Sequence, residues 1–297
     1  MSWWNQLVTS SSPVITDGAW GTQLQASGLQ LGELPDAWNL THPDRVLEVA
    51  KLYVDAGSDI ILTNTFGASQ PRLAETGLEN EASEINRLGA QISRSAAQNH
   101  ARVFGSIGPS GKMLLTGDIT PDTLLKAFTE QAQALAEGGV DALVIETMSD
   151  PEEARIAITA AKTTSLPIVA CMVFDAGKNK DRTMMGNTPE QIAAILTEAG
   201  ANAIGSNCGQ GIANFIPLTQ RLKSATHLPI WIKANAGLPE MVNGQATYTT
   251  SPQQFASHYS ALQQAGATFI GGCCGTNPLF IQALLQARQT STPATDP

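Results

Sequence analysis

The sequence is poor in charge, and most of the charge it has is negative. Only 14% of its 297 residues are charged, and 26 acidic side chains outnumber 17 basic ones, giving a formal net charge of −9. Nucleic acids and anionic membrane surfaces bind clusters of lysine and arginine. We therefore expect no nucleic-acid partner and no membrane partner.

Three further absences bear on where the protein works. No lysine or arginine precedes Arg45, so the opening stretch MSWWNQLVTSSSP lacks the basic start of a secretory signal. No apolar run approaches the roughly 20 residues that span a bilayer. Four cysteines in so long a chain do not make a disulfide framework. Together these features predict a soluble cytoplasmic protein.

Four segments of the chain share one pattern. Each ends an amphipathic stretch, passes a glycine and enters a short apolar run. They are YVDAGSDIILTN (53–64), LAEGGVDALVIET (135–147), LTEAGANAIGSN (196–207) and LQQAGATFIGGC (262–273). Glycine just past a helix end is a left-handed cap. An apolar run without alternation is typical of a strand buried on both faces.

Further strands and helices fill the gaps between these segments. The additional strand candidates are 13–17, 102–107, 166–174 and 228–235, and helical patterns lie near 43–57, 81–99, 121–138, 151–163, 189–199, 212–225, 252–265 and 277–288. Eight strands, each followed by a helix, predict an α/β fold, a single (β/α)8 TIM barrel. We expect one domain over 1–297, with a core of about 13–288 and a loose tail at 289–297. An open doubly wound sheet is the alternative.

The residues that end the predicted strands are the functional candidates, because a barrel of this kind carries its active site at the C-terminal ends of its strands. The strand ends hold Asp17 and Gly18, Asn64, Glu146, Asn207 and Cys208, Asn235, and Cys273 and Cys274. Three of the four cysteines therefore meet at one end of the barrel. The fourth, Cys171, lies mid-strand and is expected in the core.

The segment GGCCGTNP (271–278) places two of these cysteines side by side. A disulfide between them is disfavoured, because neighbouring Cα atoms are ~3.8 Å apart and relaxed disulfides need roughly 4.4–6.8 Å. With Cys208 they match a tetrahedral zinc site with one open position. Gly271, Gly272 and Gly275 supply the backbone freedom to turn both thiols inward. Such a zinc holds a substrate thiol as a nucleophilic thiolate, so the expected reaction is alkyl transfer to a thiol.

These motifs resemble the homocysteine S-methyltransferase family. The resemblance runs from about 13 to 287 and is carried by DGAWGTQLQ (17–25), GSDIILTNTFGAS (57–69), FGSIGPSGK (104–112), VIETMSD (144–150), GSNCG (205–209), KANAGLPE (233–240) and GGCCGTNP. It implies a zinc (β/α)8 barrel that methylates homocysteine to methionine. The stretches TNTFGAS and NAG most resemble the homocysteine-binding module of cobalamin-dependent methionine synthase.

The resemblance also implies roles for the other strand-end residues. Asp17, with Gly18, would hold the amino-acid end of homocysteine, although Asp-Gly is also a turn signal. We assign Glu146 to the substrate ammonium, since a buried glutamate needs a partner; a structural ion pair is the alternative. Asn64, Asn207 and Asn235 could orient ligands, fill the vacant zinc position or cap loops.

The methyl donor is predicted from the length of the sequence and from its motifs. One barrel fills the sequence, with no segment left for a corrinoid or folate module. Because the motifs most resemble the module that takes its methyl group from methylcobalamin, the resemblance implies a methylated corrinoid such as methylcobalamin as the donor, free or on a separate partner protein. The alternative is a small onium donor (S-methylmethionine, S-adenosylmethionine or betaine), which needs an aromatic-lined pocket. From another functional class, a non-catalytic zinc- or thiol-binding module is a further alternative.

Overall fold

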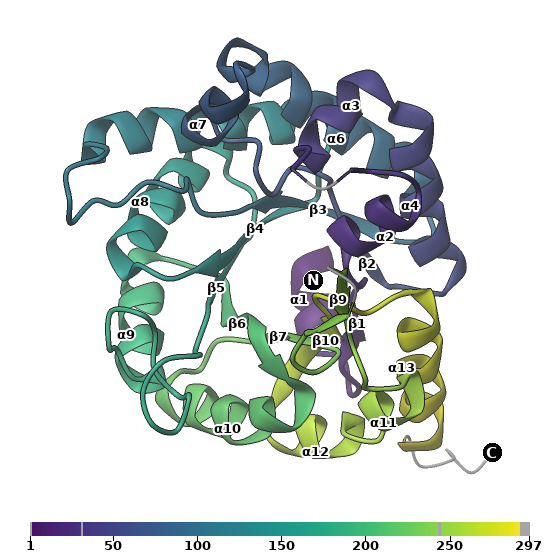
Figure 1. The fold of residues 1–297 in the computed structure, drawn as a ribbon. Helices are drawn as coiled ribbons and strands as arrows, with labels where there is room; N and C mark the ends of the chain where they lie inside the picture. The colour runs from purple at the N-terminus through teal and green to yellow at the C-terminus, as the bar shows by residue number, and fades with distance from the viewer. Residues whose placement is uncertain (1, 31, 243–244, 292–297) are drawn as a thin grey trace.

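Eight parallel strands form a ring with the helices outside it (Figure 1), in a computed structural model that describes residues 2–30, 32–242 and 245–291. In the order β1-β10-β7-β6-β5-β4-β3-β2, the strands are β1 (Val14–Ile15), β10 (Ala267–Gly272), β7 (Ile230–Asn235), β6 (Ala203–Gly211), β5 (Ile168–Met172), β4 (Ala142–Met148), β3 (Arg102–Ile107) and β2 (Ile60–Leu62). A parallel bridge between Thr16 and Ile60 links the two ends of the sheet. The predicted (β/α)8 TIM barrel is confirmed, and the open doubly wound sheet is excluded.

The predicted helices are present close to their expected positions. They are α4 (Pro43–Asp55), α6 (Ala82–Ala97), α7 (Pro121–Glu137), α8 (Pro151–Ala161), α9 (Pro189–Ala199), α10 (Phe215–Ala225), α11 (Pro252–Ala256), α12 (Tyr259–Gln264) and α13 (Pro278–Ser291). The stretch expected as one helix over 252–265 is thus divided into α11 and α12.

Several short elements were not predicted. They are the helices α1 (Trp3–Val8), α2 (Trp20–Ala26), α3 (Trp38–Thr41) and α5 (Gln70–Leu73), the hairpin strands β8 (Glu240–Val242) and β9 (Gln245–Thr247), and the 3-10 turns Pro35–Ala37, Ala74–Thr76, Glu79–Glu81, Lys162–Thr164 and Ile212–Asn214. Most of them follow the C-terminal end of a barrel strand, where the loops carry sequence-specific rather than periodic structure.

Local signals explain where the long helices start and stop. Thr188 and Ser251 close capping boxes with Gln191 and Gln254 at the first turns of α9 and α11, which satisfies backbone N–H groups that a helix leaves unpaired. The glycines of the four repeated segments all have left-handed φ values between 91° and 98°. Each therefore ends its helix as the sequence predicted.

Alternate residues of the strands fill the barrel interior, while the intervening residues pack against the helices. The interior set is Val14, Ile60, Leu62, Phe104, Ala142, Val144, Val169, Cys171, Ala203, Trp231 and Phe269. Because side chains along a strand alternate between two faces, the next inward positions at the C-terminal ends are Ser106, Glu146, Asn207, Lys233 and Cys273. The alternation that places apolar side chains inside the barrel thus also places these polar side chains at its mouth.

The N-terminal helix α1 closes the opposite end of the barrel. The ring of Trp3 lies 4.9 Å from the guanidinium of Arg102, the first residue of β3. The ring of Trp4 lies 6.3 Å from that of Phe104 and 6.1 Å from that of Phe269. In Figure 1, α1 is the purple helix seen through the ring of strands. Aromatic side chains therefore pack into this end of the barrel.

Helix α13 continues to Ser291, which corrects the expected start of a loose tail at 289. Two contacts hold its last turns: Arg288 pairs with Asp59 at 2.5 Å, and the hydroxyl oxygens of Ser260 and Ser291 are 2.8 Å apart. The remainder of the predicted tail, 292–297, lies outside the described residues. In the described part of the chain, no helix combines the length and apolar character needed to cross a membrane.

Candidate metal and substrate site

A cavity of about 440 Å³ opens at the C-terminal ends of the strands. Six of the predicted site residues line it: Gly18, Asn64, Glu146, Cys208, Cys273 and Cys274. The other three, Asp17, Asn207 and Asn235, are buried beside it and do not line it. The barrel mouth therefore collects all nine predicted residues into one region.

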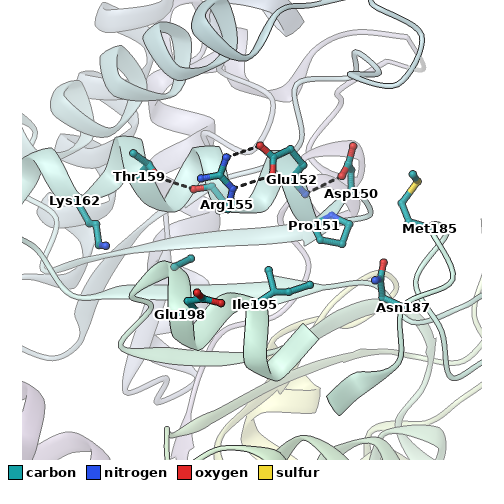
Figure 2. A pocket seen from close by; sticks show the side chains of 11 residues that line it. Asp150, Pro151, Glu152, Arg155, Thr159, Lys162, Met185, Asn187, Ile195 and Glu198 are labelled. Atoms are coloured by element: carbon teal, nitrogen blue, oxygen red, sulfur yellow. Dashed lines mark hydrogen bonds and ion pairs between the residues drawn. The ribbon is translucent and has the colours of Figure 1, made fainter. Parts of the chain in front are cut away.

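A larger groove, of about 780 Å³, lies on the outer wall between α8 and α9 (Figure 2). Arg155, at its centre, pairs with Glu152 at 2.5 Å, and Asp150 accepts a hydrogen bond from the Glu152 N–H at 2.8 Å. These side chains pair with one another and cap the start of α8. The groove holds none of the predicted site residues, so the mouth cavity is the candidate site.

The three cysteine sulfurs at the mouth lie within 4.8 Å of one another, and those of Cys208 and Cys274 are 3.9 Å apart. A tetrahedral zinc with bonds of about 2.3 Å sets its sulfur ligands about 3.8 Å apart. The thiols therefore fit zinc with little rearrangement. Among the described residues, no other group of three His, Cys, Asp or Glu side chains is close enough to hold a metal.

Backbone irregularity explains how Cys208 reaches the site. By strict alternation Cys208 would point away from the interior, since Asn207 points into it. Cys208 instead has a left-handed φ of 62°, and the pairing of β6 with β7 shifts register between Asn207 and Gly211. Strain of this kind in a residue other than glycine is concentrated at functional sites. Thr147, at the end of β4, has the same φ.

The glycines around Cys273 and Cys274 divide into two roles. Gly275 has a left-handed φ of 79° and provides the predicted turn. Gly271 and Gly272 do not have a left-handed φ, and they allow close packing instead. A Cβ atom would lie 1.9 Å from Thr16 Oγ1 at Gly271 and 2.3 Å from Thr276 Oγ1 at Gly272. The expectation that all three glycines turn the chain is corrected accordingly.

The contacts among the three sulfurs shift their pKa values in opposite directions. Hydrogen bonds from Cys273 and Cys274 lower the pKa of Cys208 to about 3. The reciprocal contacts raise the pKa of Cys274 to about 12, and they raise the pKa of Cys273 together with burial. A cysteine binds a metal as its thiolate, so a metal held by these sulfurs would displace the thiol protons that remain.

Glu146 lies in the wall beside the thiols. It is 7% exposed, and its carboxylate accepts hydrogen bonds from Ser106 Oγ at 2.6 Å and Asn207 Nδ2 at 3.2 Å. Burial raises its pKa despite the nearby charge of Lys233. Each carboxylate oxygen can accept more than one hydrogen bond, so Glu146 keeps capacity for a cationic ligand group.

The three asparagines have different surroundings. Asn207 bridges Glu146 to Thr147, donating to Thr147 Oγ1 at 2.7 Å and accepting from its N–H at 2.7 Å. Asn235 hydrogen-bonds to Cys208, while its own buried Oδ1 has no partner. Asn64 donates a hydrogen bond to the carbonyl of Pro35 at 2.8 Å, which ties it to the segment between β1 and α3. Only Asn235 therefore has an oxygen to offer near the thiols.

Asp17 has a partner that was not predicted. It is fully buried, accepts hydrogen bonds from the Leu62 N–H and the Trp20 indole at 2.7 Å each, and forms an ion pair with Lys233. Lys233 lines the cavity and Asp17 does not. Gly18 beside it must be glycine, since a Cβ atom would lie 2.7 Å from Thr276 Oγ1. Within the protein, Asp17 therefore contacts an ammonium group, that of Lys233.

Comparison with known proteins now fixes the family. The family model described as homocysteine S-methyltransferase matches residues 14–288. The chain belongs to the homocysteine S-methyltransferase family. The predicted resemblance is confirmed by this match, which covers all eight strands of the barrel.

Individual relatives of this homocysteine S-methyltransferase family member are of two kinds. The chain is 28% identical to the methionine synthases of Mycobacterium leprae and Mycobacterium tuberculosis, over 92% and 94% of its length. It spans only about a quarter of the length of those relatives, 24% and 25%. In fold it is similar to the homocysteine methyltransferase MmuM from Escherichia coli in its metallated form, with a TM-score of 0.79 and 23% identity, covering 94% of this chain and 97% of that one.

Two of the charged residues in the cavity wall, Lys233 and Asp36, were given no role by the sequence analysis. Lys233 follows the inward period of Trp231 and could have been found from it. Asp36 gives no such signal, because it lies in the 3-10 turn Pro35–Ala37, which is too short to show a period. It accepts a hydrogen bond from the Gly67 N–H at 2.9 Å, and burial raises its pKa to about 6. Both residues place charge on the cavity wall.

Proposed function

We propose that this protein transfers a methyl group to the thiol of L-homocysteine to form methionine, at a zinc ion held by Cys208, Cys273 and Cys274. The single observation that carries the proposal is the set of three sulfurs within 4.8 Å at the mouth of a barrel of this family. No histidine lies in the described cavity wall to complete a closed structural site, and structural zinc sites take four protein ligands.

The residues present fit a metal that accepts one further ligand. Zinc, when bound there, supplies a positive charge that keeps an incoming thiol ionised at neutral pH. Asn235 supports the assignment, because its side chain hydrogen-bonds to Cys208 and its unpartnered Oδ1 would be available as an oxygen ligand to a metal there. The same oxygen would otherwise be a buried acceptor left unsatisfied, which costs free energy.

The cavity wall then holds the amino-acid end of the substrate. Glu146 accepts the substrate ammonium, and Ser106 and Asn207 keep its carboxylate in place. Gly18 lets the ligand approach the backbone at the end of β1. Asp17 acts from beneath by holding Lys233. A charge-assisted pair in a site this buried is short and strong.

The transfer itself needs no general base. The thiolate sulfur of homocysteine attacks the methyl carbon of the donor, a carbon–sulfur bond forms, and the bond between methyl and donor breaks with its electron pair staying on the donor. The thiol proton leaves when the thiol binds. The protein's part is to place the sulfur, exclude competing nucleophiles and stabilise the anion.

The rim of the mouth supports a large methyl donor. Seven of the eight large hydrophobic side chains that are exposed in the described part of the chain follow the C-terminal ends of strands: Phe66, Met113, Leu115, Met184, Met185, Leu238 and Leu279. Exposed apolar side chains that gather at one end of a protein are typical of an interaction surface. A corrinoid is too large for a cavity of about 440 Å³. We therefore propose a methylcorrinoid, free or on a separate protein, that sits on the rim.

One observation favours a small onium donor as the second candidate. Asp36, Trp20 and Phe66 line the cavity together, and a carboxylate beside aromatic rings suits a sulfonium or quaternary ammonium group. This pocket lies inside the cavity, where a donor of the size of S-methylmethionine or betaine could enter.

A donor panel distinguishes the candidates. Zinc-loaded protein and homocysteine are incubated with methylcobalamin, S-methylmethionine, S-adenosylmethionine, betaine or methyltetrahydrofolate, and methionine is measured. We expect methionine with methylcobalamin. Methionine from an onium compound alone would replace the corrinoid by the second candidate. Homocysteine binding without methionine from any donor would favour a non-catalytic thiol-binding module.

A further inference from the structure

Lys233 is a buried cation in the wall of the mouth cavity. It is 2% exposed, lies at the C-terminal end of β7, and pairs with the fully buried Asp17. A charge taken out of water this completely costs several kcal/mol unless other charges compensate it. Burial alone would lower the pKa of Lys233, but the charges of Asp17 and Glu146 outweigh it and raise that pKa. Lys233 is therefore an ammonium donor in the cavity wall, beside the carboxylate of Asp17.

The hydrogen bonds of this ammonium are incomplete. A lysine ammonium has three N–H donors, and in the described part of the chain its one hydrogen-bond acceptor is Asp17 Oδ1. The carboxylate of Glu146 accepts hydrogen bonds from Ser106 and Asn207, and among the described residues none joins it to Lys233. Because Lys233 also lines the cavity, it has donors left for a ligand.

We propose that Lys233 binds the α-carboxylate of the substrate, so that Lys233 and Glu146 together select a zwitterionic amino acid. This assignment rests on the proposed function and names the group that recognises one end of its substrate. A single cavity that offers a cation and an anion matches the two charges of an amino acid, while the thiol end points to the cysteines.

Arg72 is the other cation in the cavity wall, and it is the weaker candidate. Its side chain is 43% exposed and already pairs with Glu75 at 2.9 Å. Solvent screens such a pair, and a surface guanidinium contributes little to binding. It therefore makes a matched control for Lys233.

The test compares L-homocysteine with 3-aminopropane-1-thiol, which is the same molecule without its carboxylate. Binding of each thiol to the zinc-loaded protein is measured by calorimetry. The wild type should bind homocysteine ~10- to 100-fold more tightly than the amine thiol, as expected for a hydrogen bond between charged groups. In Lys233→Met the ratio should fall to near unity through weaker homocysteine binding, with the amine thiol little changed.

Two variants guard against a purely structural effect. Lys233→Met leaves Asp17 buried without its partner, so the double variant Asp17→Asn with Lys233→Met removes both charges and should fold; it should show the same lost ratio. Arg72→Gln should retain the wild-type ratio. A preserved ratio in the double variant, or equal weakening of both thiols, would overturn the assignment. A wild type that binds neither thiol would overturn the proposed function, and the role of Lys233 with it.

Discussion

Replacing Glu146 by glutamine removes one negative charge from the cavity and leaves one acceptor oxygen in place of two, so that Asn207 Nδ2 loses its weaker bond at 3.2 Å. Glutamine has the same length, and its amide oxygen can still accept from Ser106 Oγ, which lies 2.6 Å from the carboxylate. The side chain is 7% exposed, so water screens its charge poorly. A charge-assisted hydrogen bond there is worth roughly 1.5–3 kcal/mol, which corresponds to a Kd about 10- to 150-fold higher.

Calorimetry of homocysteine binding to zinc-loaded protein measures this change directly. Glu146→Gln should keep its zinc content and its thermal stability while binding homocysteine that much more weakly. Glu153→Gln is the matched control: Glu153 is also buried and also has a raised pKa, but it accepts a hydrogen bond from the Ser110 N–H at 2.7 Å and does not line the cavity. Unchanged affinity in Glu146→Gln, or an equal loss in both variants, would refute the role of Glu146.

Two further predictions concern stability. Burial raises the pKa of Asp36 to about 6 from an ordinary 3.8, so its ionisation opposes folding as the pH rises through 6. Asp36→Asn should therefore raise the free energy of unfolding by about 3 kcal/mol at pH 8. This gain should vanish near pH 4, where the carboxyl group of the folded protein is protonated. Urea unfolding at both pH values checks this, and a gain independent of pH would contradict it. Trp4→Ala should lower the free energy of unfolding by about 2–3 kcal/mol, because the ring fills the closed end of the barrel, without changing homocysteine affinity; a large loss of affinity at unchanged stability would show that α1 serves the site instead.

The barrel could be predicted because its strands are buried on both faces and its helices carry explicit start and stop signals. The run RVFGSI was expected as a strand over 102–107, and β3 has these bounds. Helix α1 escaped prediction since six residues show no reliable period, and its stability comes from rings on β3 and β10. The last turn of α13 depends on Asp59, which lies far away in the sequence.

The site could be predicted in part for similar reasons. The cysteines could be recognised as metal ligands by their residue type and by their place at strand ends. The partner of Asp17 could not be read from the sequence, because Lys233 lies 216 positions away and only the closed barrel brings the two together. Likewise, the left-handed backbone of Cys208 breaks the alternation on which strand predictions rest.

Metal analysis of the purified chain and of its cysteine variants tests the central claim most directly. Cys208→Ala and Cys274→Ala are compared with Cys171→Ala, which removes a thiol from the barrel core away from the mouth. We predict about one zinc per chain in the wild type and in Cys171→Ala, and loss of zinc together with methionine formation in the other two variants. Wild-type zinc content in both Cys208→Ala and Cys274→Ala would contradict the three-cysteine site.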